Sequence, residues 1–261
     1  MLNEMFGLDG QVAFITGAAR GLGQFYSATL AEAGADIVVS DLKLDTLEET
    51  VKLVESFGRK ALALECNVRD VDSIQAAMEK AAAHFGRIDI LINNAGLNVR
   101  KRALDITQAD WDTVLEINLR GQFFVAQACA RVMKEQGYGR IVNVGSVTTH
   151  FAYKGMTPYC ASRGGVRQMT MSLACDYAEY GISVNCLAPG WYATEQTRVL
   201  CENDEWREYI FDRIPMHRMG VFDELRAPLL FLTSKANSYY TGQVVLVDGG
   251  ITTGDTRATV N

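Results

Sequence analysis

Short runs of β-branched and aliphatic residues alternate with longer helix-like stretches along most of this 261-residue chain. Such alternation predicts strand–helix–strand units, whose right-handed crossovers place the strands parallel in one sheet. The strand segments VAFI and IDILI are continuously apolar, as expected for a sheet that is covered on both faces. The predicted fold is therefore α/β: a single doubly wound, Rossmann-type parallel sheet with helices on both faces.

Hydrophobic spacing and turn residues locate the individual elements. We expect strands at Gln11–Thr16, Asp36–Ser40, Ala61–Glu65, Ile88–Ile92, Arg140–Val144, Ser183–Leu187 and Val244–Val247. We expect helices at Gly21–Ala33, Leu44–Phe57, Val71–Phe85, Asp110–Leu119, Gln122–Glu135, Tyr159–Tyr180 and Leu225–Leu232. No Pro/Ser-rich linker or repeat interrupts them, which favours one domain over residues 1–261, with a less patterned segment near 190–220 that covers a ligand.

The composition excludes several classes of protein. With 48% hydrophobic and 21% charged residues, the chain has an ordinary globular composition and is not expected to be disordered. Its net charge of -6, without a basic run, argues against nucleic acid or an anionic membrane surface as a partner. The sequence contains no apolar stretch near the ~20 residues of a membrane span and no signal-peptide pattern at its amino terminus. We therefore expect a cytoplasmic protein.

The six cysteines and three histidines lie far apart, and no C-x-x-C motif occurs. Dispersed cysteines in a chain of this size indicate reduced, mostly buried thiols. A structural metal site needs clustered ligands, so we expect none.

Glycines bracket the turn that follows the first expected strand. Its sequence is Thr16-Gly17-Ala18-Ala19-Arg20-Gly21-Leu22-Gly23. Glycine lets a diphosphate approach the main chain, and the amides at the start of the next helix face its charge. A loop with incidental glycines is the alternative. The position between a strand and a helix favours a dinucleotide diphosphate site that includes Gly17, Arg20, Gly21, Leu22 and Gly23.

Asp41 stands at the end of the second expected strand. A carboxylate there accepts hydrogen bonds from both ribose hydroxyls of an adenosine and repels a 2′-phosphate. Arg20 is the contrary signal, because an arginine in the glycine turn can contact that phosphate. Repulsion by a carboxylate at hydrogen-bond distance outweighs a mobile, screened arginine, which favours NAD over NADP. A helix-capping role for Asp41 is the alternative.

Tyr159 and Arg163 are four residues apart on an expected helix, so both project from one face. A nearby cation favours the phenolate form of a tyrosine, which suits it to general acid/base catalysis. Ser146 ends the segment RIVNVGS, where its hydroxyl could hold a substrate oxygen against the tyrosine. Taken singly, Tyr159 could be a packed aromatic and Ser146 a capping residue. Their joint position at the carboxyl edge of the sheet favours a reactive site.

Several further segments occur in a characteristic order with these residues. They are NNAG at Asn93–Gly96, Asn118, the Y-x-x-x-R of Tyr159–Arg163, PGWYAT at Pro189–Thr194 and VDGG at Val247–Gly250. On these motifs the whole chain resembles a short-chain dehydrogenase/reductase. Asn93–Asp105, Phe211–Gly220 and Thr241–Gly254 are most similar to its sugar-acid branch, which includes gluconate 5-dehydrogenases and 2-dehydro-3-deoxygluconate 5-dehydrogenases.

The resemblance implies an NAD(P)-dependent enzyme that interconverts a secondary alcohol and a ketone on a sugar acid or polyol. It implies that Tyr159 exchanges the proton, that Ser146 stabilises the substrate oxygen, and that the main chain at Asn118 anchors a water relay. It further implies a homotetramer, although the same helices could bury their apolar faces within one subunit. The implied cofactor contacts are Asn67 and Val68 at the adenine, Asn94, Ala95 and Gly96 beside the adenosine, and Pro189, Gly190 and Thr194 at the nicotinamide. Tyr159 and Arg163 are implied cofactor contacts as well, because the family residue at position 163 binds the nicotinamide ribose and polarises the tyrosine.

Arg163 departs from the resemblance, because the family has lysine at this position. Arginine keeps the positive charge, but its guanidinium is planar and longer, and it does not pass a proton onward. An active site that tolerates arginine, an impaired enzyme and a nucleotide-binding protein without turnover are the three possibilities. Retention of Ser146, Tyr159 and Asn118 favours an active enzyme.

The substrate contacts are less determined by the sequence. Asn98-Val99-Arg100-Lys101-Arg102 places guanidinium groups where one could pair with a substrate carboxylate, or where all could form a solvated charge run. The expected contacts are Asn98, His150, Tyr153 and Trp191, with Tyr192, Glu195 and Gln196 on the same covering segments. His150 could equally be an ordinary loop histidine, and Trp191 could pack the covering segment. A carbonyl or hydroxysteroid reductase is the alternative function.

Overall fold

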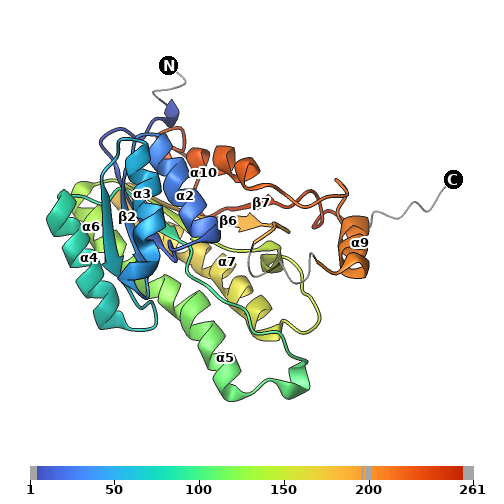
Figure 1. Ribbon diagram of the computed structural model, residues 1–261. Helices are drawn as coiled ribbons and strands as arrows, with labels where there is room; N and C mark the ends of the chain where they lie inside the picture. The colour runs from blue at the N-terminus through green and yellow to red at the C-terminus, as the bar shows by residue number, and fades with distance from the viewer. Residues whose placement is uncertain (1–4, 195–196, 198–201, 255–261) are drawn as a thin grey trace.

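A seven-stranded parallel sheet forms the centre of the computed structural model, which describes residues 5–194, 197 and 202–254 (Figure 1). Its order is β3-β2-β1-β4-β5-β6-β7. The strands are β1 (Val12–Thr16), β2 (Asp36–Asp41), β3 (Ala61–Glu65), β4 (Ile90–Asn93), β5 (Gly139–Val144), β6 (Ile182–Pro189) and β7 (Val244–Val247). The predicted Rossmann-type sheet is confirmed, and the direction of winding reverses between β1 and β4.

Helices cover both faces of the sheet because neighbouring residues of each strand point in opposite directions. Phe14 belongs to the core on one face and Ile15 to the core on the other. The first core includes residues of α4 (Val71–Phe85), α6 (Gln122–Gln136) and α7 (Thr157–Tyr177). The second includes residues of α2 (Gly21–Glu32), α3 (Glu48–Ser56) and α10 (Arg226–Thr233). Both cores are therefore continuous layers between sheet and helices.

The helix pair expected at 110–119 and 122–135 is one continuous helical element. α5 (Gln108–Leu115) passes through a π-helical turn at Glu116–Gly121 directly into α6. No proline interrupts the segment. Gly121 ends the π turn, and the position needs glycine because a Cβ there would be 2.6 Å from the carbonyl oxygen of Val68. The π turn therefore packs α6 against the loop after β3.

The segment near 190–220 contains a helix that we did not predict, α9 (Asp204–Arg213). Asn203 caps it by accepting a hydrogen bond from the amide of Trp206, and Ile210 is its buried residue. The sequence DEWREYIFDR lacks a clear apolar stripe, so the spacing of its hydrophobic residues does not predict a helix. α9 lies beyond β7 in Figure 1.

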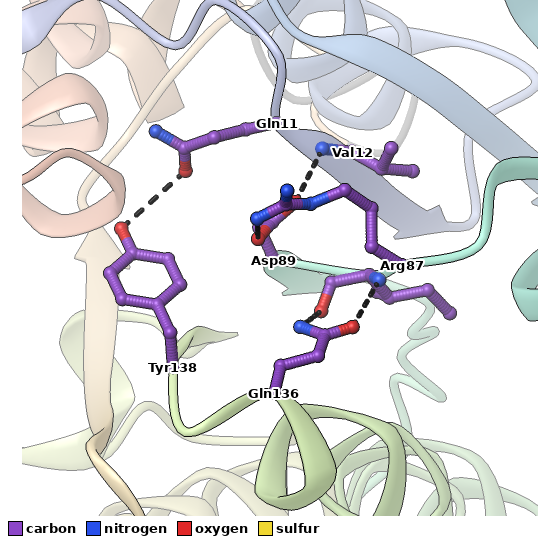
Figure 2. A network of polar contacts seen from close by, with 7 residues as sticks. Gln11, Val12, Arg87, Asp89, Gln136 and Tyr138 are labelled. Carbon is purple, nitrogen blue, oxygen red and sulfur yellow. Dashed lines mark hydrogen bonds and ion pairs between the residues drawn. The ribbon is translucent and has the colours of Figure 1, made fainter.

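A polar network around the buried Asp89 ties together the amino ends of β1, β4 and β5 (Figure 2). Asp89 is fully buried; it accepts the amide of Val12 at 2.9 Å and pairs with Arg87 at 2.6 Å. Gln136 donates to the carbonyl of Ile88 and accepts its amide, both at 2.9 Å. This edge of the sheet is held by polar groups that satisfy one another.

None of the helices in the described ranges is long and apolar enough to cross a membrane. Within residues 5–194, 197 and 202–254, no group of three or more His, Cys, Asp or Glu side chains is arranged to hold a metal ion.

Candidate active site

The glycine turn after β1 has the shape of a diphosphate cradle. Gly17 and Gly21 have φ angles of 65° and 59°, a conformation that favours glycine. A Cβ on Gly23 would lie 2.0 Å from the carbonyl oxygen of Gly17. The first turn of α2 has no acidic residue and no capping side chain, so its amides can face an anion. These features fit the dinucleotide that the sequence predicts.

Asn94 fixes this turn to the end of β4. Its side-chain amide donates to the carbonyls of Thr16 and Gly17, each at 3.0 Å. The Thr16 hydroxyl accepts the amides of Asn94 and Ala95, also at 3.0 Å. The NNAG segment therefore holds the glycine turn beside the point where the sheet reverses its winding, which is the usual ligand crevice of such folds.

Asp41 lies at the carboxyl end of β2, next to the glycine turn. One carboxylate oxygen accepts the amide of Ala19 at 3.1 Å and the other accepts the amide of Leu42 at 2.8 Å. The Arg20 side chain is exposed. The side-chain oxygen of Asn67 accepts a hydrogen bond from the amide of Arg69 at 3.1 Å. Val68 is buried. The carboxylate is thus fixed in place by two backbone amides.

A cavity of about 480 Å³ opens at the carboxyl ends of β5 and β6. Ser146 and Tyr159 share its wall, as do the predicted contacts Asn98, Tyr153 and Trp191. The other lining residues are Leu97, Arg100, Val147, Thr148, Met156, Gly190 and Thr197. Thr194 is not in this wall; its amide donates to the Thr197 hydroxyl at 2.9 Å. The structure therefore brings Ser146 and Tyr159 to one cavity with three of the predicted substrate contacts, Asn98, Tyr153 and Trp191.

Ser146 has a structural partner as well as a place in the cavity. Its Oγ accepts the amide of Thr148 at 3.2 Å and caps the short 3-10 turn Val147–Thr149. A hydroxyl that accepts one hydrogen bond still has its proton to donate. The capping and substrate-binding interpretations of Ser146 are therefore compatible.

Arg100 enters the cavity beside Tyr159. Partial burial lowers the pKa of the Arg100 guanidinium, and attraction to the Tyr159 hydroxyl group in its ionised form opposes that shift. Arginine stays protonated at any physiological pH. Arg100 therefore supplies a permanent positive charge to the same cavity as Ser146 and Tyr159.

Tyr153 and Trp191 contact each other in the wall of the same cavity. The Trp191 indole N–H donates to the Tyr153 hydroxyl at 2.7 Å, and their rings meet edge to face at 5.3 Å. Trp206 of α9 continues the stack on Trp191 at 4.7 Å. Burial raises the pKa of Tyr153 to about 12, against the smaller lowering by the Trp191 bond. Tyr153 therefore keeps a proton to donate, and Trp191 also packs the covering segment.

Two expected substrate contacts lie away from the cavity. His150 is exposed, and its ring nitrogen shares a 2.8 Å hydrogen bond with the Thr149 hydroxyl. Partial burial and Arg167 lower the pKa of His150, while Asp248 raises it. Tyr192 is 4% exposed and donates to the Val247 carbonyl at 3.1 Å. The predicted substrate residues Glu195 and Gln196 lie outside the described residues.

The cavity wall also contains residues that sequence reasoning missed. Thr148 and Met156 belong to it, as do Leu97, Val147 and Thr197. Thr148 follows Ser146 by two residues, a proximity that would have been a usable signal. Met156 and Thr197 had none, because nothing in a single sequence relates them to the strand ends.

Asn118, in the π turn before α6, and Arg163, on α7, are buried beside the NNAG turn and are not among the residues that line the cavity. The Asn118 side chain accepts the amide of Leu97 and donates to its carbonyl, both at 2.8 Å. Arg163 is 4% exposed, donates to the Val144 carbonyl at 3.0 Å and has its Cζ 5.0 Å from the centre of the Tyr159 ring. The positive charge thus lies beside the phenol, as the sequence predicted.

Known proteins resemble this chain over nearly its whole length. A family model described as enoyl-(acyl carrier protein) reductase matches residues 17–252. The 2-dehydro-3-deoxy-D-gluconate 5-dehydrogenase of Escherichia coli K12 is 40% identical, over 96% of this chain and 98% of the relative. The chain belongs to the short-chain dehydrogenase/reductase family. As a member, it is an NAD(P)-dependent oxidoreductase that acts on CH–OH groups.

Two further relatives come from the sugar-acid branch that the sequence suggested. The gluconate 5-dehydrogenase of Gluconobacter oxydans is 38% identical over 95% of this chain and 97% of its own length. A crystal structure of a Burkholderia cenocepacia gluconate 5-dehydrogenase, in complex with NADP and tartrate, superposes with a TM-score of 0.94. It is 37% identical and covers 97% of this chain and 100% of that one. The resemblance to this branch is confirmed.

Proposed function

We propose that this protein interconverts a secondary alcohol and a ketone on a sugar acid, with NAD as the hydride acceptor. The observation that carries the substrate class is the shared cavity: Arg100 lines it together with Ser146 and Tyr159. A guanidinium near the reacting groups can bind a carboxylate through charge-assisted hydrogen bonds. The names of the relatives, which act on gluconate and 2-dehydro-3-deoxygluconate, support the same class.

Proton transfer is the task of Tyr159 in this proposal. When alcohol is oxidised, the phenolate oxygen of Tyr159 accepts the hydroxyl proton, and Arg163 lies over the same ring, with its Cζ 5.0 Å from the ring centre. Ser146 donates its free proton to the same substrate oxygen and stabilises the alkoxide as it forms. The bound dinucleotide supplies the hydride acceptor.

Asn118 holds the part of the cavity wall that follows the NNAG turn. Its paired hydrogen bonds to Leu97 hold the chain that leads from the NNAG turn to Asn98 and Arg100. In this proposal Arg100 on that loop binds the substrate carboxylate, so the position of the loop sets the distance between the carboxylate and the reacting carbon.

The choice of NAD over NADP rests on Asp41. Its carboxylate is fixed by the amides of Ala19 and Leu42, where it meets the adenosine ribose in this proposal. A 2′-phosphate there would face a like charge at short range. We expect kcat/KM to be higher with NAD than with NADP, and Asp41→Ser to shift the ratio toward NADP. Equal use of both cofactors by the wild type would refute this choice.

A substrate panel tests the proposed class. Formation of reduced cofactor would be followed with sugar acids, with the amides of the same acids, with neutral polyols, and with hydroxysteroids. We expect turnover on sugar acids and little on the amides, because only the acids bear a carboxylate. A preference for steroids or neutral polyols would favour the alternative reductase function, and no turnover on any compound would favour a nucleotide-binding protein.

Arg100→Met sharpens that test. Losing a charge-assisted contact is expected to raise KM for sugar acids about 10- to 100-fold, with little change in KM for the cofactor. Arg102→Met is the matched control, because Arg102 is exposed on the same loop and is not in the cavity wall. An unchanged KM in Arg100→Met would remove the carboxylate site from the proposal.

The quaternary structure is a separate proposal. We propose a homotetramer built through α6 and α7 and through the carboxyl-terminal strand, as the family resemblance implies. Analytical ultracentrifugation tests it: a tetrameric mass is expected, and a monomer at micromolar concentration would contradict it.

A further inference from the structure

The guanidinium of Arg163 touches three separate parts of the active site. Its Nη1 donates to the carbonyl of Val144 at 3.0 Å. Its Cζ lies over the Tyr159 ring at 5.0 Å. Its Nη2 occupies the space beside Gly96, where an added Cβ would approach it to 2.5 Å. One planar group therefore contacts the end of β5, the phenol and the NNAG turn.

Each of these contacts leads directly to a group with a proposed role. Val144 is the last residue of β5 and lies two residues before Ser146. Gly96 precedes Leu97, the residue that Asn118 holds by two hydrogen bonds. Tyr159 is on the same helix as Arg163, one turn earlier. A shift of the guanidinium would therefore change the positions of Ser146, Tyr159 and the NNAG turn relative to one another.

Arg163 is also an uncommon kind of buried charge. It is 4% exposed, and no carboxylate among the described residues forms an ion pair with it. Its Nε has no hydrogen-bond partner in the described structure. Burying a charge without a counter-ion is costly, so the position is not explained by stability.

We propose that Arg163 is a positioning residue that braces Val144, Gly96 and Tyr159 through the shape of its guanidinium. A lysine ammonium is a point charge with a flexible stem and cannot make the three contacts together. The site is thus built around the planar group, and a positive charge alone does not replace it. The role rests on the proposed function of Tyr159 and Ser146.

Arg163→Lys gives the first test, because it keeps the positive charge and removes the planar guanidinium with its several N–H donors. We expect kcat to fall about 10- to 100-fold, as for misplaced reacting groups, while the cofactor Kd measured by fluorescence changes less than threefold. Arg167→Lys is the matched control: Arg167 is exposed one turn later on α7, and its variant should keep the wild-type kcat. Wild-type kcat in Arg163→Lys, or an equal loss in both variants, would overturn the proposal.

A stability cycle tests the brace without relying on turnover. Gly96→Ala in the wild-type background should lower Tm by several degrees, because the new Cβ meets Nη2. In the Arg163→Lys background the same substitution should lower Tm much less, since the obstructing nitrogen is gone. Equal Tm losses in both backgrounds, or no loss in Gly96→Ala alone, would overturn the brace. If the wild type had no turnover, the proposed function would fail while this cycle would still decide the contact.

Discussion

The two edges of the sheet differ in the surroundings of one arginine each: the half-exposed Arg87 at the amino edge and the buried Arg163 at the carboxyl edge. At the amino edge, Arg87 pairs with the fully buried Asp89 at 2.6 Å, and Asp89 also accepts the amide of Val12 (Figure 2). At the carboxyl edge, Arg163 is buried beside Tyr159 and Val144 and has no carboxylate partner among the described residues. Arg87 is therefore paired with a carboxylate at the amino edge, whereas no described carboxylate pairs with Arg163 at the carboxyl edge.

This contrast separates stability from chemistry. Asp89 and Gln136 bind backbone groups at the starts of strands, so they fix the sheet. Arg100, Ser146 and Tyr159 face a cavity, where a charge or a proton has value only toward a ligand. Substitutions at the amino edge should therefore change the free energy of unfolding, and substitutions at the carboxyl edge should change turnover.

Tyr159→Phe should have the largest effect at the carboxyl edge. Removing the group that exchanges the proton is expected to lower kcat on the order of 1,000-fold. The free energy of unfolding should change by less than ~1 kcal/mol, because the ring that packs against Arg163 is kept. Steady-state kinetics and urea unfolding measure both quantities. A variant with substantial turnover would contradict the assigned role.

Asp89→Ala should have the opposite signature. It breaks a buried ion pair and frees the amide of Val12, so we expect a loss of about 3 kcal/mol in the free energy of unfolding. This value is at the lower end for such pairs because the Arg87 side chain is 49% exposed and can be hydrated. Turnover per folded molecule should be unchanged. A large fall in kcat for the folded fraction would break the contrast between the edges.

Gln136→Leu should give a smaller loss of the same kind. It removes two hydrogen bonds to the backbone of Ile88, and we expect about 1–2 kcal/mol of destabilisation. Urea unfolding measures this loss. If Gln136→Leu cost as much as Asp89→Ala, the ion pair would not be the main tie at this edge.

Ionisation of Tyr153 should contribute almost nothing to the pH dependence of KM for a sugar acid. Its pKa is raised to about 12, mainly by burial, so the hydroxyl stays protonated and able to donate from pH 6 to about pH 10. We expect KM for a sugar acid to vary with pH in parallel in the wild type and in Tyr153→Phe over that range. An ionisation near pH 8 that disappears in Tyr153→Phe would show that the hydroxyl is not held neutral.

The sequence predicts the strands better than the contacts of the site. Ala61–Glu65 and Val244–Val247 form strands with the expected bounds, because continuous apolar runs are a local signal. α9 was missed, since its burial depends on contacts with Trp191 and its neighbours rather than on a stripe in its own sequence. The expected break near residue 120 is absent because a π turn accommodates Gly121.

The site residues show the same division. The sequence places Ser146 and Tyr159 together at the carboxyl edge of the sheet, and the structure has both in the wall of one cavity. The His150 ring binds Thr149 instead of entering the cavity, and nothing in the sequence distinguishes these two rotamers. The brace of Arg163 joins residues 96, 144 and 159, so it exists only after the fold has brought three elements together.

Deuterium transfer tests the central claim most directly. A sugar acid that carries deuterium on its carbinol carbon would be incubated with the wild-type protein and NAD, and the reduced cofactor would be analysed by mass spectrometry. The account predicts that the reduced nicotinamide carries the deuterium, and that Tyr159→Phe forms almost none of it. Reduced cofactor without the label, or none from any sugar acid, would contradict the account.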